Sequence, residues 1–142
     1  MHISETTIKV RYAETDQMGV VYHANYLVWM ELGRTKHIED IGFQYAEMEN
    51  EGILCPVVDL QISYKKPFRY GDTATVKTWI EEYNGVRLTY GYEMYSEDGE
   101  LAVSGSSEHI CVKKDSFRPI SLKKRFANWH EVYEKVKKQT QS

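Results

Sequence analysis

Hydrophobic and polar residues alternate along five stretches of the chain, and this two-residue period predicts strands with one buried face. The five stretches are residues 5–11, 57–64, 73–83, 86–95 and 101–112. Between the first and the second stretch, the period changes to that of a helix. Residues 24–41 predict one long helix whose apolar positions cover a wide arc. Those positions are Tyr26, Leu27, Trp29, Met30, Leu32, Gly33, His37, Ile38 and Ile41.

Residues with capping and turn preferences mark the ends of these elements. Gly42 suits the left-handed position that follows a helix, and Asn25 or His23 is the expected N-cap. The Asn-Gly pair at residues 84–85 and the Asp-Gly pair at residues 98–99 predict tight hairpin turns. These turns make the later strands an antiparallel meander.

The end of the chain adds a second helix to this pattern. Ser121 can cap a helix whose apolar stripe contains Phe126, Trp129, Tyr133 and Val136. We also expect a short helical turn over residues 44–51 and a bulge in the last strand near residues 105–107.

The order of elements predicts an α+β fold in a single domain, residues 1–142. In this fold a curved, antiparallel, five-stranded sheet wraps around one long central helix, and a C-terminal helix is added. A single curved sheet leaves open edges that a second protomer would cover, so we expect a homodimer or a homotetramer.

Composition narrows the class of protein. The net charge is only −3, so we expect no nucleic-acid partner. No apolar run approaches the roughly 20 residues that a membrane helix needs, and the N-terminus does not resemble a signal peptide. We therefore expect a cytoplasmic protein without an integral membrane segment. Cys55 and Cys111 are far apart and lack a CxxC partner, so free buried thiols are expected.

The candidate chemistry lies in the polar loop before the long helix. This loop holds Tyr12 and Asp16, and it ends at His23. Asp16 can attack a carbonyl carbon as a nucleophile or activate water as a general base. The backbone N–H groups of His23 and Ala24, at the helix start, can polarise a carbonyl oxygen. The five histidines and two cysteines show no metal-ligand spacing, so we predict no metal.

The segment from Arg11 to Arg34 reads R-Y-x-E-T-D-x-x-G-V-V-Y-H-A-N-Y-L-x-W-x-E-x-x-R. It closely resembles the 4-hydroxybenzoyl-CoA thioesterase family of the hot-dog fold, in particular the bacterial acyl-CoA thioesterases encoded near Tol-Pal genes. The later motif Y-x-x-P-x-x-x-x-D, from Tyr64 to Asp72, also fits that family. The expected order of strands and helices matches the hot-dog fold along nearly the whole chain.

The resemblance implies hydrolysis of an acyl-CoA thioester at sites formed between protomers, with no cofactor beyond the CoA of the substrate. It makes Asp16 the essential carboxylate and gives supporting roles to Tyr12 and His23. Ala24 and Asn25 are candidate substrate-binding residues at the helix start. Two groups of cations are candidates for the CoA phosphates: Lys65, Lys66 and Arg69, and Lys113, Lys114 and Arg118.

Several residues also have a purely structural interpretation. Asp16 can be a turn residue that binds the backbone at Gly19, and Tyr12 can pack in the core. Glu31 and Arg34 are expected to form an ion pair on the helix. His109 is expected in the core.

Three functions remain open at this point. The first is an acyl-CoA thioesterase, with acyl-carrier-protein thioesters as a close variant. The second is a hot-dog hydratase, for which His37 with Glu39 or Asp40 is the available pair, near the wrong end of the helix. The third is a non-catalytic acyl-CoA-binding or scaffold protein.

Overall fold

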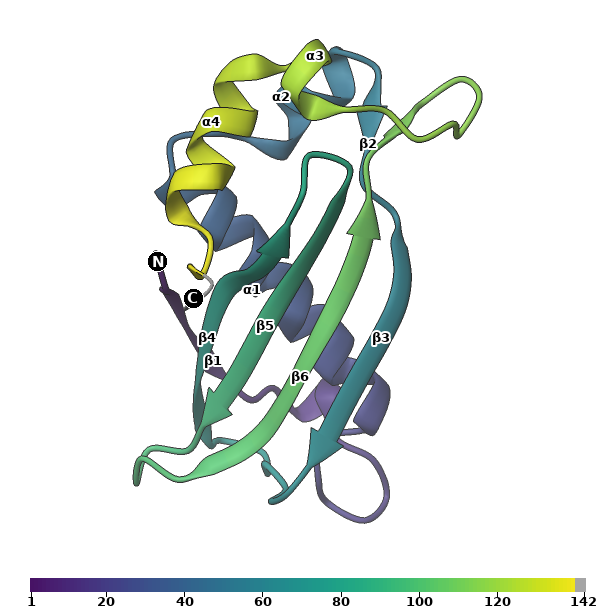
Figure 1. Ribbon diagram of the computed structural model, residues 1–142. Coiled ribbons are helices and arrows are strands. Elements are labelled where there is room, and N and C mark those ends of the chain that lie inside the picture. The colour runs from purple at the N-terminus through teal and green to yellow at the C-terminus, as the bar shows by residue number, and fades with distance from the viewer. Residues whose placement is uncertain (140–142) are drawn as a thin grey trace.

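A computed structural model describes residues 1–139, in which an antiparallel sheet wraps around one long helix (Figure 1). The strands are β1 (Ser4–Lys9), β2 (Ile53–Leu54), β3 (Val57–Tyr64), β4 (Thr73–Tyr83), β5 (Arg87–Tyr95), β6 (Leu101–Ile110) and β7 (Val112–Lys113). The helices are α1 (Tyr26–Asp40), α2 (Tyr45–Asn50), α3 (Leu122–Arg125) and α4 (Ala127–Val136). Two short 3₁₀ turns, Tyr12–Glu14 and His23–Asn25, precede α1.

Five strands form one sheet in the order β1-β4-β5-β6-β3, and β2 pairs with β7 separately. All of these pairs are antiparallel. The predicted α+β fold, with its five-stranded antiparallel sheet and central helix, is confirmed. No helix within residues 1–139 is both long and apolar enough to cross a membrane.

The predicted bulge was placed wrongly. Residues 105–107 pair in regular register with both neighbouring strands. The register shifts instead lie between Val57 and Asp59, between Ile80 and Glu82, and between Met94 and Tyr95. The small residues in the middle of β6 have another use, because a side chain at Gly105 would collide with the Gln61 carbonyl and the Met30 side chain.

One face of α1 is buried against the sheet, and Trp29 and Met30 on it are completely buried. The predicted arc was too wide. Leu27 and Leu32 are 40% and 46% exposed, because α1 lies against β1, β4 and β5 and leaves its other side uncovered. A helix with this pattern presents an apolar surface that nothing within residues 1–139 covers.

Gly33 sets how closely α1 approaches β4. A Cβ atom at this position would lie 2.3 Å from the Thr78 side-chain oxygen and 3.4 Å from a Val76 methyl group. Helix and strand can therefore approach each other only because residue 33 has no side chain.

We predict that Gly33→Ala destabilises the protein by about 1–3 kcal/mol, because the added methyl group pushes α1 away from the sheet. Urea unfolding of the variant measures this loss. Thr78→Ala in the same chain removes the colliding oxygen and should restore part of the stability. If Gly33→Ala unfolds at the parent urea concentration, this contact does not set the spacing.

Candidate active site

The loop before α1 is built around the buried carboxylate of Glu14, which is only 6% exposed. One carboxylate oxygen accepts the Trp29 indole N–H at 2.8 Å, and the other accepts the Arg11 backbone N–H at 2.9 Å. The Arg11 side chain lies 3.6 Å from the same carboxylate. Burial alone would raise the pKa of Glu14, but these hydrogen bonds and the Arg11 charge outweigh it and hold the pKa below its usual range.

The backbone carbonyl of Glu14 closes the other side of the loop. It accepts the backbone N–H of Tyr22 at 2.9 Å and the side-chain amide of Asn25 at 2.8 Å. Asn25 occupies the N-cap position of α1, as predicted, but its side chain makes no capping bond to the helix. It braces the loop instead, and residues 15–21 are thereby held at the helix start.

Asp16 lies in this braced loop and is half-buried. One of its carboxylate oxygens accepts the Met18 backbone N–H at 2.8 Å, and its backbone carbonyl accepts the Gly19 N–H at 3.0 Å. The side-chain bond is that of a turn residue, although it reaches Met18 rather than Gly19. The second carboxylate oxygen has no hydrogen-bond donor within residues 1–139, so it is available to a substrate or to water.

Two backbone N–H groups at the start of α1 are also available. Among residues 1–139, those of His23 and Ala24 have no hydrogen-bond acceptor, whereas Asn25 donates to the Tyr22 carbonyl. Unpaired N–H groups of this kind suit a developing oxyanion. The His23 ring is exposed and lies against Tyr22.

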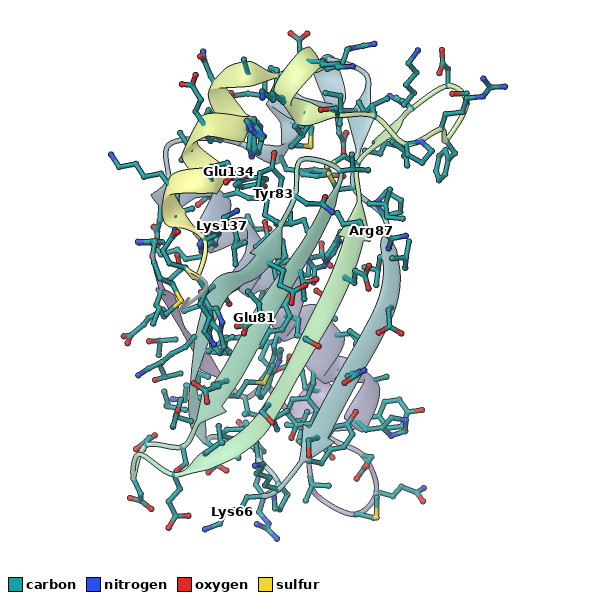
Figure 2. The ribbon with its side chains drawn as sticks, in the orientation of Figure 1. Lys66, Glu81, Tyr83, Arg87, Glu134 and Lys137 are labelled. Carbon is teal, nitrogen blue, oxygen red and sulfur yellow. The ribbon has the colours of Figure 1, made fainter. Side chains whose placement is uncertain are left out.

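A shallow groove of about 240 Å³ runs along this loop. Val20, Val21, His23, Tyr26, Tyr64, Lys65, Lys66 and Pro67 line it. The Tyr64 hydroxyl donates to the His23 carbonyl at 3.3 Å, which ties the end of β3 to the loop. Lys66 forms an ion pair with Glu100. Figure 2 labels Lys66 at this end of the molecule.

The remaining predicted site residues, Asp16 among them, do not line the groove. Tyr12 is 76% exposed and its ring contacts Tyr70, so it neither packs in the core nor binds Asp16. Arg69 pairs through its backbone with Val20 but does not line the groove. The second cationic group begins at Lys113, the last residue of β7, at the opposite end of the protomer (Figure 1).

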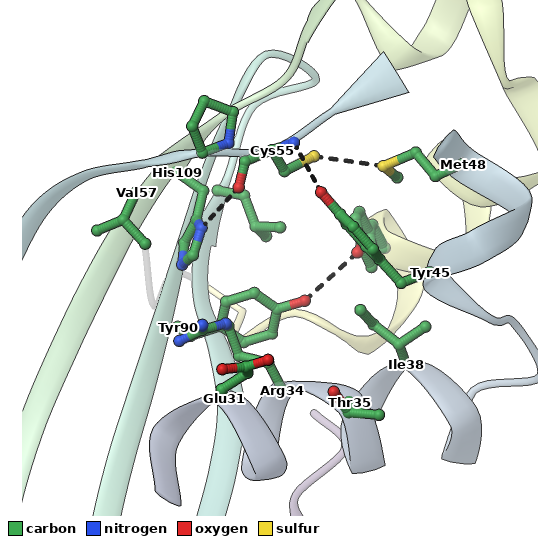
Figure 3. A pocket seen from close by; sticks show the side chains of 13 residues that line it. Glu31, Arg34, Thr35, Ile38, Tyr45, Met48, Cys55, Val57, Tyr90 and His109 are labelled. Carbon is green, nitrogen blue, oxygen red and sulfur yellow. Dashed lines mark hydrogen bonds between the residues drawn. The ribbon is translucent and has the colours of Figure 1, made fainter. Parts of the chain in front are cut away.

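A deeper cavity of about 270 Å³ lies beside α1, between this helix and the sheet (Figure 3). Its walls include Glu31, Arg34, Thr35, Ile38, Tyr45, Met48, Cys55, Val57, Tyr90 and His109. Glu31 and Arg34 do not form the predicted ion pair: no carboxylate within residues 1–139 lies within 4 Å of the guanidinium. Arg34 instead donates to the Tyr92 hydroxyl at 2.9 Å.

This hydrogen bond is the first of a buried series of four. The groups at the two ends of the series determine which partner donates in each bond. Arg34 can only donate, and the carbonyl of Cys55 can only accept. Tyr92 therefore donates to Ser107 at 2.6 Å, Ser107 donates to His109 Nε2 at 2.8 Å, and His109 Nδ1 donates to the Cys55 carbonyl at 3.0 Å. Burial and the nearby Arg34 charge lower the pKa of His109 to about 4, consistent with a neutral ring. His109 is thus a core residue, as expected, but one that orients Arg34.

Sequence reasoning gave no role to Glu14, Tyr92 or Ser107. Glu14 stands in the same motif as Asp16, and Trp29 follows it by 15 residues. A separation of 15 residues does not indicate contact, because Glu14 reaches Trp29 only when the loop folds back onto α1. Within residues 1–139 there is no group of three His, Cys, Asp or Glu side chains placed to hold a metal ion.

We predict that Glu14→Gln lowers the free energy of unfolding by about 2 kcal/mol, because an amide nitrogen would face the N–H of Trp29 or Arg11. Unfolding of the parent and variant at several pH values measures the difference. The pKa of Glu14 is lowered in the folded protein, so its contribution is complete above the ordinary value of 4.5 and is lost as the pH falls further. Glu97→Gln, at an exposed turn, is the matched control. A difference that does not shrink in acid would contradict this account.

The family model of the thioesterase-like superfamily matches residues 10–130. YneP of Bacillus subtilis, provisionally named an acyl-CoA thioesterase, is 62% identical over 97% of this chain and 100% of its own length. The crystal structure of a DHNA-CoA thioesterase from Staphylococcus aureus is 51% identical, with a TM-score of 0.92 over 95% of this chain and 91% of that one. A 1,4-dihydroxy-2-naphthoyl-CoA hydrolase of Thermosynechococcus vestitus is 28% identical over 73% of this chain and 72% of its own length. The chain therefore belongs to the thioesterase-like superfamily and is a thioester hydrolase with the hot-dog fold.

Proposed function

We propose that this protein hydrolyses acyl-CoA thioesters, with Asp16 as the reacting carboxylate. The observation that carries the proposal is that one braced loop holds a free Asp16 oxygen and leads directly to the unpaired N–H groups of His23 and Ala24. The relatives named as acyl-CoA thioesterases support the same substrate class. Membership of the Tol-Pal-associated subgroup stays a prediction, and acyl-carrier-protein thioesters remain the alternative substrate.

In this mechanism the thioester carbonyl oxygen binds the N–H groups of His23 and Ala24. The free oxygen of Asp16 then attacks the carbonyl carbon, or it takes a proton from the water that does so. The carbon–sulfur bond breaks and CoA leaves as a thiolate, which needs no strong acid. Direct attack would leave a mixed anhydride on Asp16 that water opens. His23 and Tyr12 are exposed and can contact the substrate from the rim.

The CoA phosphates need cations near this loop. Lys65 and Lys66 line the groove, and we propose them as the first phosphate contacts. The ion pair between Lys66 and Glu100 is exposed, so a phosphate can compete for Lys66 at small cost. Arg69 would reach the ligand only by turning toward the groove.

A second copy of the chain would complete the site. β3 is an edge strand, and Val57, Val58, Leu60 and Tyr64 on it are all more than a third exposed. Leu27, Val28 and Leu32 form the uncovered apolar surface of α1. Pairing two β3 edges about a two-fold axis would bury both sets, which is the usual solution for an open apolar edge.

The same symmetry would bring the loop of one copy to the cavity of the other. In an antiparallel pair of β3 strands, Val57 of one copy lies beside Tyr64 of the second copy. Val57 lines the cavity, and Tyr64 is tied to the His23 loop. An acyl group held at Asp16 of one copy could therefore enter the cavity beside α1 of the other.

The polar groups of this cavity favour a hydroxylated aromatic acyl group. The rings of Tyr45, Tyr90 and His109 form flat walls. Arg34 uses one N–H on the Tyr92 hydroxyl and offers its remaining N–H groups as donors, and Glu31 offers an acceptor. A hydroxyl group can satisfy both, because it accepts from the guanidinium and donates to the carboxylate. An alkyl chain can hydrogen-bond to neither group. The name of the 1,4-dihydroxy-2-naphthoyl-CoA hydrolase of Thermosynechococcus vestitus agrees with this preference.

We predict that Asp16→Asn lowers thioester turnover by at least about 100-fold, because the amide can neither attack nor accept a proton. It keeps the oxygen that binds Met18, so the thermal midpoint should stay close to that of the parent. CoA release from a panel of alkanoyl- and aroyl-CoA substrates measures turnover. Asp115→Asn, at an exposed turn after β7 and at the opposite end of the protomer, is the control. Parent-like turnover by Asp16→Asn would exclude this role.

We also predict that the parent prefers a hydroxyaroyl-CoA over the unsubstituted aroyl-CoA by about 10-fold or more in kcat/KM. Arg34→Gln should narrow that ratio, because it removes the charged donor in the cavity. Arg87→Gln, whose partner Glu108 lies on the outer surface, is the matched control. An unchanged kcat/KM ratio in Arg34→Gln would show that Arg34 does not distinguish between the two acyl groups.

A further inference from the structure

Two separate strand pairs share one register along the same side of the molecule. β3 pairs with β6 so that Val57 lies opposite His109. β2 pairs with β7 so that Leu54 lies opposite Val112. Continuing either register places Cys55 directly opposite Cys111. Neither cysteine belongs to a named strand, so the pairing appears only when the two ladders are joined.

The hydrogen bonds show whether residues 55 and 111 form a hydrogen-bonded or a non-hydrogen-bonded pair of the antiparallel ladder. Ile110 donates its N–H to the Pro56 carbonyl at 3.3 Å, so residues 56 and 110 form the hydrogen-bonded pair. Cys111 donates instead to Val86 on its other side. Cys55 and Cys111 thus occupy a non-hydrogen-bonded pair, for which the Cα atoms are typically about 4.5 Å apart. That separation lies inside the range that a disulfide spans.

The side chains already face each other. The two sulfur atoms are 3.3 Å apart and both thiols are free. Cys111 is completely buried, whereas Cys55 is partly buried and lines the cavity beside α1, where Figure 3 shows it. A small oxidant that enters the cavity therefore meets Cys55 first and Cys111 behind it.

We propose that Cys55 and Cys111 form a cross-strand oxidation site that closes to a disulfide within the folded protein when a hydroperoxide enters the cavity. The Cys55 sulfur attacks one peroxide oxygen, the O–O bond breaks, and Cys55 becomes a sulfenic acid as water leaves. The Cys111 sulfur then attacks Cys55, the S–O bond breaks, and a second water leaves. Two electrons pass from the two thiols to one hydrogen peroxide, which is reduced to two water molecules.

The environment of the Cys55 thiol determines the rate of this oxidation. The hydrogen bond between Cys55 and Cys111 and the burial of the thiol raise the pKa of Cys55 well above its usual range. Little thiolate is present at neutral pH, so oxidation is slow and the reduced pair is the resting state. The Cys55 sulfur also lies 3.3 Å from the Met48 sulfur. Closure of the disulfide would move the Cys55 sulfur away from Met48.

The test is to incubate the reduced, folded chain with hydrogen peroxide for several hours and then to remove the oxidant. Intact mass and thiol titration under denaturing conditions follow the modification, and peptide mapping locates it. We expect the loss of both thiols, a mass lower by two hydrogen atoms, and a peptide that links Cys55 to Cys111. The thermal midpoint should rise by about 10 °C, because the bond closes a long loop of the unfolded chain.

Cys55→Ser and Cys111→Ser are matched variants that each keep one thiol, and neither should give the mass change or the rise in the thermal midpoint. Two free thiols in the treated parent would overturn the proposal. So would thiols that gain oxygen atoms without pairing, or a disulfide between two chains. None of these readouts depends on thioester hydrolysis, so they remain informative if the proposed function is wrong.

Discussion

The candidate active site depends on the hydrogen bonds that hold the buried carboxylate of Glu14. A charged group at this depth is stable only if several donors face it, and Trp29 and Arg11 supply them. Trp29, on α1, is itself completely buried in the core of the protein, so the loop is fixed to the central helix. The consequence is that Asp16 can be held in place while one of its oxygens stays free.

The same helix has two functions at its two faces. The face with Gly33 and Met30 is packed so closely on the sheet that a glycine is required at each of two contacts, Gly33 and Gly105. The opposite face keeps Leu27 and Leu32 exposed and places Arg34 at a cavity. An enzyme assembled from two such protomers would have its reacting loop on one chain and its acyl cavity on the other.

Much of the fold could be predicted from the sequence, because periodicity and turn residues are local signals. The strands, the long helix and the Asn-Gly hairpin are of this kind, and the motif around Asp16 is a local signal that makes this residue a candidate. What could not be predicted depends on register and on contacts between distant residues. The hydrogen-bond chain from Arg34 to Cys55 joins four segments, and the Cys55–Cys111 pair is separated by 56 positions. The exposure of Leu27 was also missed, since helical spacing alone does not show which side of a helix the sheet covers.

The most direct test of the central claim is a subunit-mixing experiment. One variant, Asp16→Asn, lacks the reacting carboxylate, and the other, Thr35→Trp, fills the cavity. Each alone should be inactive toward an aroyl-CoA. If the site combines the loop of one protomer with the cavity of another, random exchange should restore about a quarter of the parent activity, because half of the dimers then contain one intact site. Heterodimers that form, as native mass spectrometry would show, but stay inactive would contradict a shared site.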